Sequence, residues 1–94
     1  MCLWTNTNHI ARLTKMQQIL NALGKRLRDL RAEQGYSQEA FADHCGLHRT
    51  AMSLLERGKR TPSLRTLLSV SQGFGISLSE LLKDVDKEMT RKHR

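Results

Sequence analysis

Residues 38–57 read QEAFADHCGLHRTAMSLLER, and this stretch decides the fold. Ala42 is a small residue at a position where two helices could touch, and Gly46 follows it four residues later. A glycine adopts the left-handed backbone conformation of a tight turn without a steric penalty. The stretch therefore predicts two short helices that meet at a steep angle across a turn of about three or four residues.

The sequence also predicts where these two helices begin and end. Ser37 is a good N-cap for a helix from Gln38 to about His44. A second helix is expected from about His48 to Arg57, with Gly58 ending it. Its apolar residues fall on one face at helical spacing, and they are Ala51, Met52 and Leu55.

Towards the N-terminus, leucines at helical spacing predict another helix, which Gly35 should end. These leucines are Leu23, Leu27 and Leu30. Residues 1–20 form an N-terminal extension with two readings left open. It is either an unneeded leader or a helical continuation, because Leu13, Met16 and Leu20 extend the same spacing backwards.

Towards the C-terminus, Thr61 and Pro62 are expected to begin a fourth helix, because proline is tolerated at the first helical position. Its apolar side is predicted to consist of Leu64, Leu67, Leu68 and Phe74. The segment from Ser77 to Glu80 fits a capping box for a short fifth helix. The chain is thus expected to be all-α, with a domain at 21–82 and a charged tail at 83–94.

Charge favours a polyanionic partner. The chain has 94 residues, a formal net charge of +7 and an isoelectric point near 10.1. The stretch 47–62 is rich in bases, with Arg49, Arg57, Lys59 and Arg60 against the single acid Glu56. The aromatic residues are far apart in the sequence, so no aromatic cluster for stacking single-stranded nucleic acid is expected; they are Trp4, Tyr36, Phe41 and Phe74.

Several function classes are disfavoured. No signal peptide or membrane-spanning run is visible, and the two cysteines have no pairing motif, so a cytoplasmic protein is expected. His44, Cys45 and His48 are close in sequence, but the turn at Gly46 separates them, and no metal site is predicted. No nucleophile–base pair, phosphate-cradling loop or carboxylate dyad appears, so neither an enzyme nor a cofactor is expected.

Four blocks of sequence carry a resemblance to a known family. They are LGKRLR at 23–28, GYSQE at 35–39, ERGKRTPSL at 56–64 and GISLSELL at 75–82. The chain resembles the helix-turn-helix regulators of the Cro/C1 (XRE) type, which include lambda-type phage repressors and restriction-modification controllers. The resemblance covers roughly residues 23–82. It implies a five-helix, lambda-repressor-like DNA-binding domain and an ion pair between Arg31 and Glu56.

The resemblance also implies how the chain meets DNA. The helix at 48–57 would lie in the major groove, and the helix before it would cross the backbone. Base-reading candidates are Thr50, Ser53 and Leu54 on its outward side and Arg49 at the flank. Phosphate-contact candidates are Gln38, His48, Arg57, Lys59 and Arg60. Arg49 suits a bidentate contact to guanine, whereas Leu54 has two open readings, a thymine-methyl contact or a surface or partner-interface residue.

The resulting hypothesis is a homodimeric transcriptional regulator on a pseudopalindromic operator, with half-sites about one helical turn, roughly 34 Å, apart. The dimer surface is expected near Ile76, Leu78, Leu81 and Leu82, some of which should belong to the core. Double-stranded DNA and a second copy of the chain are the expected partners, with RNA polymerase and a cognate toxin as further candidates and no membrane. The alternatives are an antitoxin that also represses its operon and a protein-binding adaptor.

Overall fold

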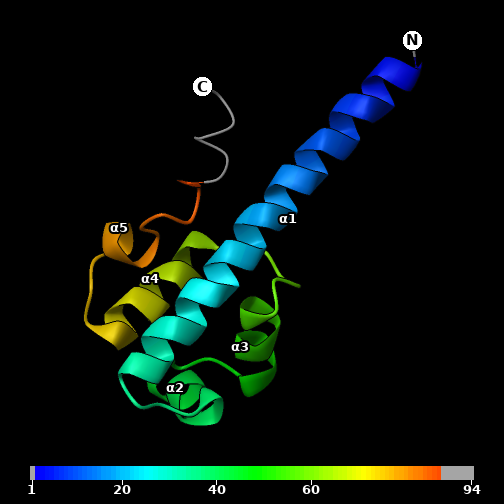
Figure 1. Cartoon of the computed structure of the whole chain (residues 1–94). Coiled ribbons are helices and arrows are strands. Elements are labelled where there is room, and N and C mark those ends of the chain that lie inside the picture. Colours follow the sequence, from blue (N-terminus) through cyan, green and yellow to red (C-terminus); the bar gives the residue numbers. More distant parts are fainter. Residues whose placement is uncertain (1, 88–94) are drawn as a thin grey trace.

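The computed structural model describes the backbone of residues 2–87 and the side chains of residues 15–87. This part of the chain is all-α, as expected, and contains five helices (Figure 1). They are α1 (Cys2–Glu33), α2 (Gln38–Cys45), α3 (Arg49–Glu56), α4 (Leu64–Phe74) and α5 (Leu78–Leu81). The last residues of the expected charged tail, 88–94, lie outside the described part.

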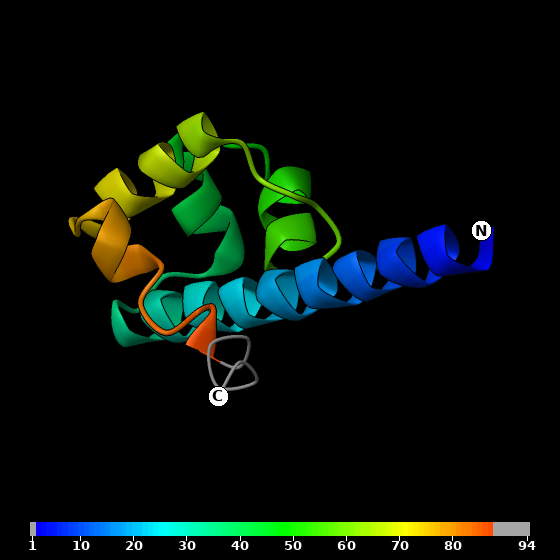
Figure 2. The same cartoon turned by 90° about the horizontal axis from the view of Figure 1, so that it is seen from above.

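Helix α1 is a single helix of 32 residues. Its second half lies across the bundle formed by the other helices, whereas its first half projects beyond them (Figures 1 and 2). The leucines at helical spacing face the bundle and are buried: Leu20, Leu23, Leu27 and Leu30. The helix therefore includes residues of the N-terminal extension and is anchored by its second half.

Serine caps fix where three of the helices begin. In each case the serine Oγ accepts a hydrogen bond from the backbone N–H three residues later, which satisfies one of the unpaired donors of the first turn. The pairs are Ser37 with Ala40, Ser63 with Thr66, and Ser77 with Glu80. The starts predicted for α2 and α5 are confirmed.

The predicted start of α4 at Thr61 and Pro62 is wrong. The helix begins at Leu64, because Ser63 has an extended backbone with φ −75° and ψ 163° and acts as the cap. Proline was read as the first helical residue, but the serine after it supplies the hydrogen bond that a helix start needs.

The core lies between α1, α2, α3 and α4. Its fully buried side chains include Leu27, Phe41, Met52, Val70 and Leu81. Ala42, the small residue predicted at the crossing of α2 and α3, is 1% exposed. Because α3 packs against both α1 and α2, and α2 in turn packs against α4, the orientation of α3 is set by the whole domain.

Aromatic residues that are far apart in the sequence meet in the fold. The centroids of Phe41 and Phe74 are 4.1 Å apart in a stacked pair, and Tyr36 lies 5.2 Å from Phe41. The ring of His44 stacks on Tyr36 at 5.3 Å. Residues distant in the sequence meet because α2 and α4 pack together. Both phenylalanine rings are buried, so the cluster stabilises the core and offers no platform for bases.

The apolar side predicted for α4 is also partly wrong. Val70, Ser71 and Phe74 face the core, whereas Leu64 is 69% exposed and Leu68 is 48% exposed. These two leucines are one turn apart on the same side of the helix, so α4 carries an apolar strip on its outer surface. Among the described residues, no helix combines the length and apolarity needed to cross a membrane.

Candidate nucleic-acid interface

Helices α2 and α3 form the unit predicted from the sequence. Gly46 ends α2 with a φ of 74°, in the left-handed region, and its backbone N–H bonds back to the last turn of the helix. The N–H of Leu47 donates to the Ala42 carbonyl at 2.8 Å. A small residue at the crossing and a left-handed glycine in the turn together produce the sharp change of direction between the two helices.

The C-terminal end of α3 is held by a buried ion pair. Glu56 is 3% exposed, and its two carboxylate oxygens accept from the Arg31 guanidinium at 2.7 and 2.9 Å. The Gln38 amide also donates to this carboxylate, at 3.1 Å. The hydrogen bond to Glu56 is the main cause that raises the pKa of Arg31 above its usual value. This network joins α1, α2 and α3.

The backbone of α1 also approaches this end of α3 closely. Gly24 lies so near that a Cβ on it would overlap the Glu56 carbonyl group, at 2.9 Å from the carbonyl carbon. The Arg28 guanidinium donates to the same carbonyl oxygen. The last carbonyls of a helix have no partner within the helix, so α1 supplies one.

The N-terminal end of α3 is built differently. His48 occupies the cap position with an extended backbone, φ −70° and ψ 143°, and makes no side-chain hydrogen bond to the first turn. His48 is exposed, as are Arg49 and Thr50. The first N–H groups of a helix carry partial positive charge, and here no side chain of the cap residue covers them.

The base-reading candidates lie along one helix. Arg49 and Thr50 are exposed, whereas Ser53 and Leu54 are partly buried. The Arg49 guanidinium pairs with the Glu39 carboxylate at 2.9 Å, and the two side chains are 67% and 72% exposed. A pair this exposed contributes little to stability, so Arg49 can exchange Glu39 for another partner at small cost.

A basic turn follows α3. Arg57, Lys59 and Arg60 are exposed, and their backbone is ordered by the hydrogen bond from the Lys59 N–H to the Leu54 carbonyl at 2.9 Å. Gly58 has a φ of 70° and is buried, so the turn reverses sharply directly after the helix. Three cations are thus held close to the end of α3.

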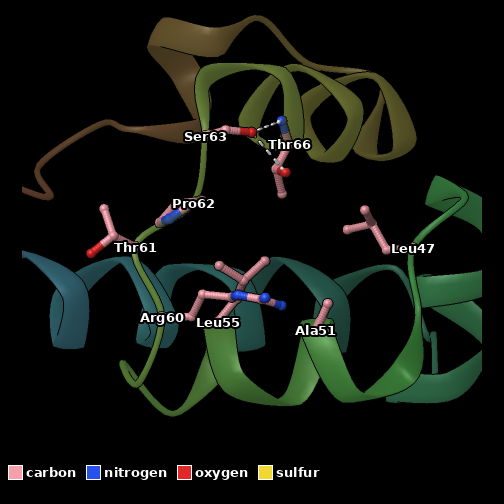
Figure 3. A pocket seen from close by; sticks show the side chains of 8 residues that line it. All are labelled: Leu47, Ala51, Leu55, Arg60, Thr61, Pro62, Ser63 and Thr66. Carbon is pink, nitrogen blue, oxygen red and sulfur yellow. Dashed lines mark hydrogen bonds between the residues drawn. The ribbon is translucent and has the colours of Figure 1, made fainter.

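A recess of about 340 Å³ separates α3 from the start of α4 (Figure 3). Leu47, Ala51 and Leu55 line one wall, and the chain from Thr61 to Thr66 forms the other. Arg60 is the only charged residue that lines it, and its side chain extends over Leu55 (Figure 3). Arg60 therefore has an apolar support for its stem and a guanidinium free to reach an anion.

Two candidates differ from their expected surroundings. The Gln38 amide is engaged by Glu56, which gives it a role in the folded domain. Leu81 is 0% exposed, so it belongs to the core and leaves the set of dimer candidates. Ile76, Leu78 and Leu82 remain partly exposed. The exposed Leu64 and Leu68 were missed, because their spacing also fits the inward side of a helix.

Cys45 and His44 both lie against Gly73 of α4. Cys45 packs against Gly73, where a Cβ would come within 3.4 Å of the Phe41 ring. Burial raises the pKa of the Cys45 thiol to about 11, so the neutral form is favoured. The His44 Nε2 atom is 3.1 Å from the Gly73 carbonyl oxygen. Among the side chains of residues 15–87, no group of three histidine, cysteine or acidic residues could hold a metal ion.

Comparisons with known proteins agree with this geometry. A family model described as helix-turn-helix, HTH_3, matches residues 27–81. Control protein C.MunI from Mycoplasma sp is 46% identical over 74 residues, which cover 78% of this chain and 100% of C.MunI. The HTH-type transcriptional regulator PuuR of Escherichia coli is 39% identical over 66 residues, which cover 70% of this chain but 36% of PuuR.

Solved structures show the same likeness. The restriction-modification controller protein C.AhdI from Aeromonas hydrophila matches with a TM-score of 0.64 and 40% sequence identity. The match covers 66% of this chain and 94% of C.AhdI. The named relatives are thus HTH-type transcriptional regulators and control proteins.

Proposed function

The chain belongs to the helix-turn-helix family HTH_3 of DNA-binding regulators, and from this premise we propose that it is a homodimeric control protein that reads a pseudopalindromic operator. The observation that carries the proposal is the contrast within α3. Its inner face and C-terminal end are fixed in the core, while Arg49 and Thr50 at its N-terminal end are exposed. In helix-turn-helix proteins the N-terminal residues of this helix touch base edges.

Arg49, Thr50, Ser53 and Leu54 are the proposed base readers. Arg49 would release Glu39 and bind guanine through its two parallel N–H groups, because the guanidinium fork matches the O6 and N7 acceptors. Thr50 offers a hydroxyl and a methyl group. Ser53 and Leu54 lie about one turn further along the helix and are partly buried.

Phosphate contacts are assigned to both sides of this helix. Before it, the open N-terminal end of α3 at His48 favours an anion. After it, Arg57, Lys59 and Arg60 form a cluster of exposed cations. The Gln38 amide gives one hydrogen to Glu56, so the proposed phosphate contact falls to its second amide hydrogen or to the backbone N–H groups at the start of α2. Such contacts fix the register on DNA and make the affinity depend on salt.

The dimer surface is proposed on the outer side of α4 and α5. Leu64 and Leu68 are the large apolar side chains most exposed on these two helices. Ile76, Leu78 and Leu82, which follow α4 in the chain, are partly exposed. Removing such side chains from water is the usual driving force of association, and a two-fold dimer matches an operator with two half-sites.

Salt dependence tests the proposal. The protein should bind duplex DNA with an affinity that falls linearly on a log–log plot against salt. Alanine variants of Arg57, Lys59 and Arg60 should each reduce this slope by about 0.9 if each contacts one phosphate. Sedimentation of the free protein should show a dimer that Leu68→Glu dissociates. An affinity independent of salt would leave a protein-binding role on the same fold.

A further inference from the structure

Gln17 connects α1 to the turn that follows α3. It precedes the segment 27–81 that the family model matches. Its Nε2 atom donates to the Gly58 carbonyl at 2.9 Å and to the Asn21 Oδ1 atom at 2.9 Å. An amide nitrogen carries two hydrogens, so both bonds can form at once. One side chain on α1 therefore holds a backbone group of the basic turn.

Asn21 completes this contact by packing. A Cβ on Gly58 would overlap the Asn21 Oδ1 atom and lie 3.3 Å from the Asn21 backbone nitrogen. Gly58 also has a φ of +70°, which glycine adopts without strain. Only a glycine lets α1 come this close to the turn, so the contact and the turn conformation depend on each other.

The position of this contact matters because of its neighbours. Gly58 stands between Arg57 and Lys59, and Arg60 follows. All three cations are exposed, whereas Gly58 itself is buried. Fixing the carbonyl of Gly58 fixes the direction in which the backbone leaves α3, and hence the points from which these side chains start.

We propose that Gln17 and Asn21 are positioning residues for DNA binding. They hold the Gly58 turn in one conformation, so that the turn is already ordered when its cations meet the phosphate backbone of DNA. The proposal rests on the DNA-binding function proposed above. Ordering a loop on binding costs affinity, and a loop ordered in advance avoids that cost. The N-terminal part of α1 thus contributes to affinity without touching DNA.

The variant Gln17→Met tests this directly. Methionine keeps the length and the helix propensity of glutamine but cannot donate to the Gly58 carbonyl. The matched control is Gln18→Met, the same change at the next position, where the side chain is partly buried. The full chain is titrated with two duplexes, one of random sequence and one selected by the wild-type protein from a random pool.

Gln17→Met should weaken binding to both duplexes by the same factor, about two- to tenfold, as expected for one lost hydrogen bond. Base preference should not change, and Gln18→Met should bind like the wild type. In a Lys59→Ala/Arg60→Ala background the effect of Gln17→Met should shrink, because the turn has lost two of its three cations. A protein that is merely less stable would show the same loss in both backgrounds.

Unchanged affinity of Gln17→Met, or an equal loss in the double-alanine background, would overturn the positioning role while leaving DNA binding intact. A wild-type chain that binds neither duplex would overturn the proposed function and this inference with it.

Discussion

The two ends of α3 are built in opposite ways. At the C-terminal end, Glu56 is 3% exposed and its carboxylate accepts hydrogen bonds from Arg31 and Gln38. At the N-terminal end, His48 makes no capping hydrogen bond, and the ion pair between Arg49 and Glu39 is largely exposed. The polar groups at the C-terminal end are paired within the fold, whereas those at the N-terminal end are exposed to solvent.

This difference shows how a small domain can present a rigid helix without covering it. A buried, paired charge specifies one arrangement of its neighbours, because any other arrangement leaves a charge unpaired. Arg31 comes from α1 and Gln38 from α2, so the angle of α3 is set from both sides. Groups at the opposite end can then exchange partners without disturbing that angle.

Removing the buried charge should have the largest effect. Glu56→Ala leaves Arg31 without its partner in a largely buried place, and losing one member of such a pair typically costs about 3–5 kcal/mol. Chemical denaturation of the variant measures the loss. Glu39→Ala, which removes the exposed acid beside Arg49, should change the free energy of unfolding by less than about 0.5 kcal/mol. Equal losses in the two variants would remove the contrast between the ends.

A smaller loss is expected from Gly24→Ala. The added Cβ would overlap the Glu56 carbonyl group, and forcing an extra carbon into a tight contact costs about 1–3 kcal/mol. The higher helix propensity of alanine offsets at most about 1 kcal/mol of this loss in stability. Thermal unfolding should therefore show a lower melting temperature. A rise in the melting temperature would mean that α1 and α3 are not in close contact here.

A cap added at the open end of α3 should raise the stability of the domain slightly and lower its affinity for DNA. His48→Asp introduces a capping side chain, which should stabilise the domain by about 1 kcal/mol. The same carboxylate should weaken DNA binding, because it occupies the place proposed for a phosphate. His48→Ser serves as the control, with a cap but no charge, and should bind more tightly than His48→Asp. Equal affinities of the two variants would argue against a phosphate at this end.

Local features of the fold were predictable from the sequence, and contacts between distant residues were not. Ser37, Ser77 and Gly46 act within a few residues of themselves, so their roles follow from spacing alone. The start of α4 was misplaced because Pro62 and Ser63 both suit a helix start, and only the hydrogen bond to Thr66 distinguishes them.

The features of the candidate site also divide into local ones, which the sequence predicts, and contacts between helices, which it does not. Arg49 and Thr50 could be placed on the exposed side of α3 from its apolar spacing. The pairing of Arg49 with Glu39, the burial of Leu81 and the bond from Gln17 to Gly58 depend on how separate helices pack. No periodicity within one helix carries that information. The aromatic cluster around Phe41 was missed for the same reason.

The most direct test of the account is a selection from a random duplex pool by the wild type and by Arg49→Ala, at one salt concentration. The wild type should enrich an inverted repeat, and the variant should lose preference at one base pair in each half-site. Its affinity for the selected duplex should fall by about 1–3 kcal/mol, with a far smaller loss on random sequence. No enrichment by the wild type, or an equal loss by Arg49→Ala on every sequence, would contradict base reading by the exposed end of α3.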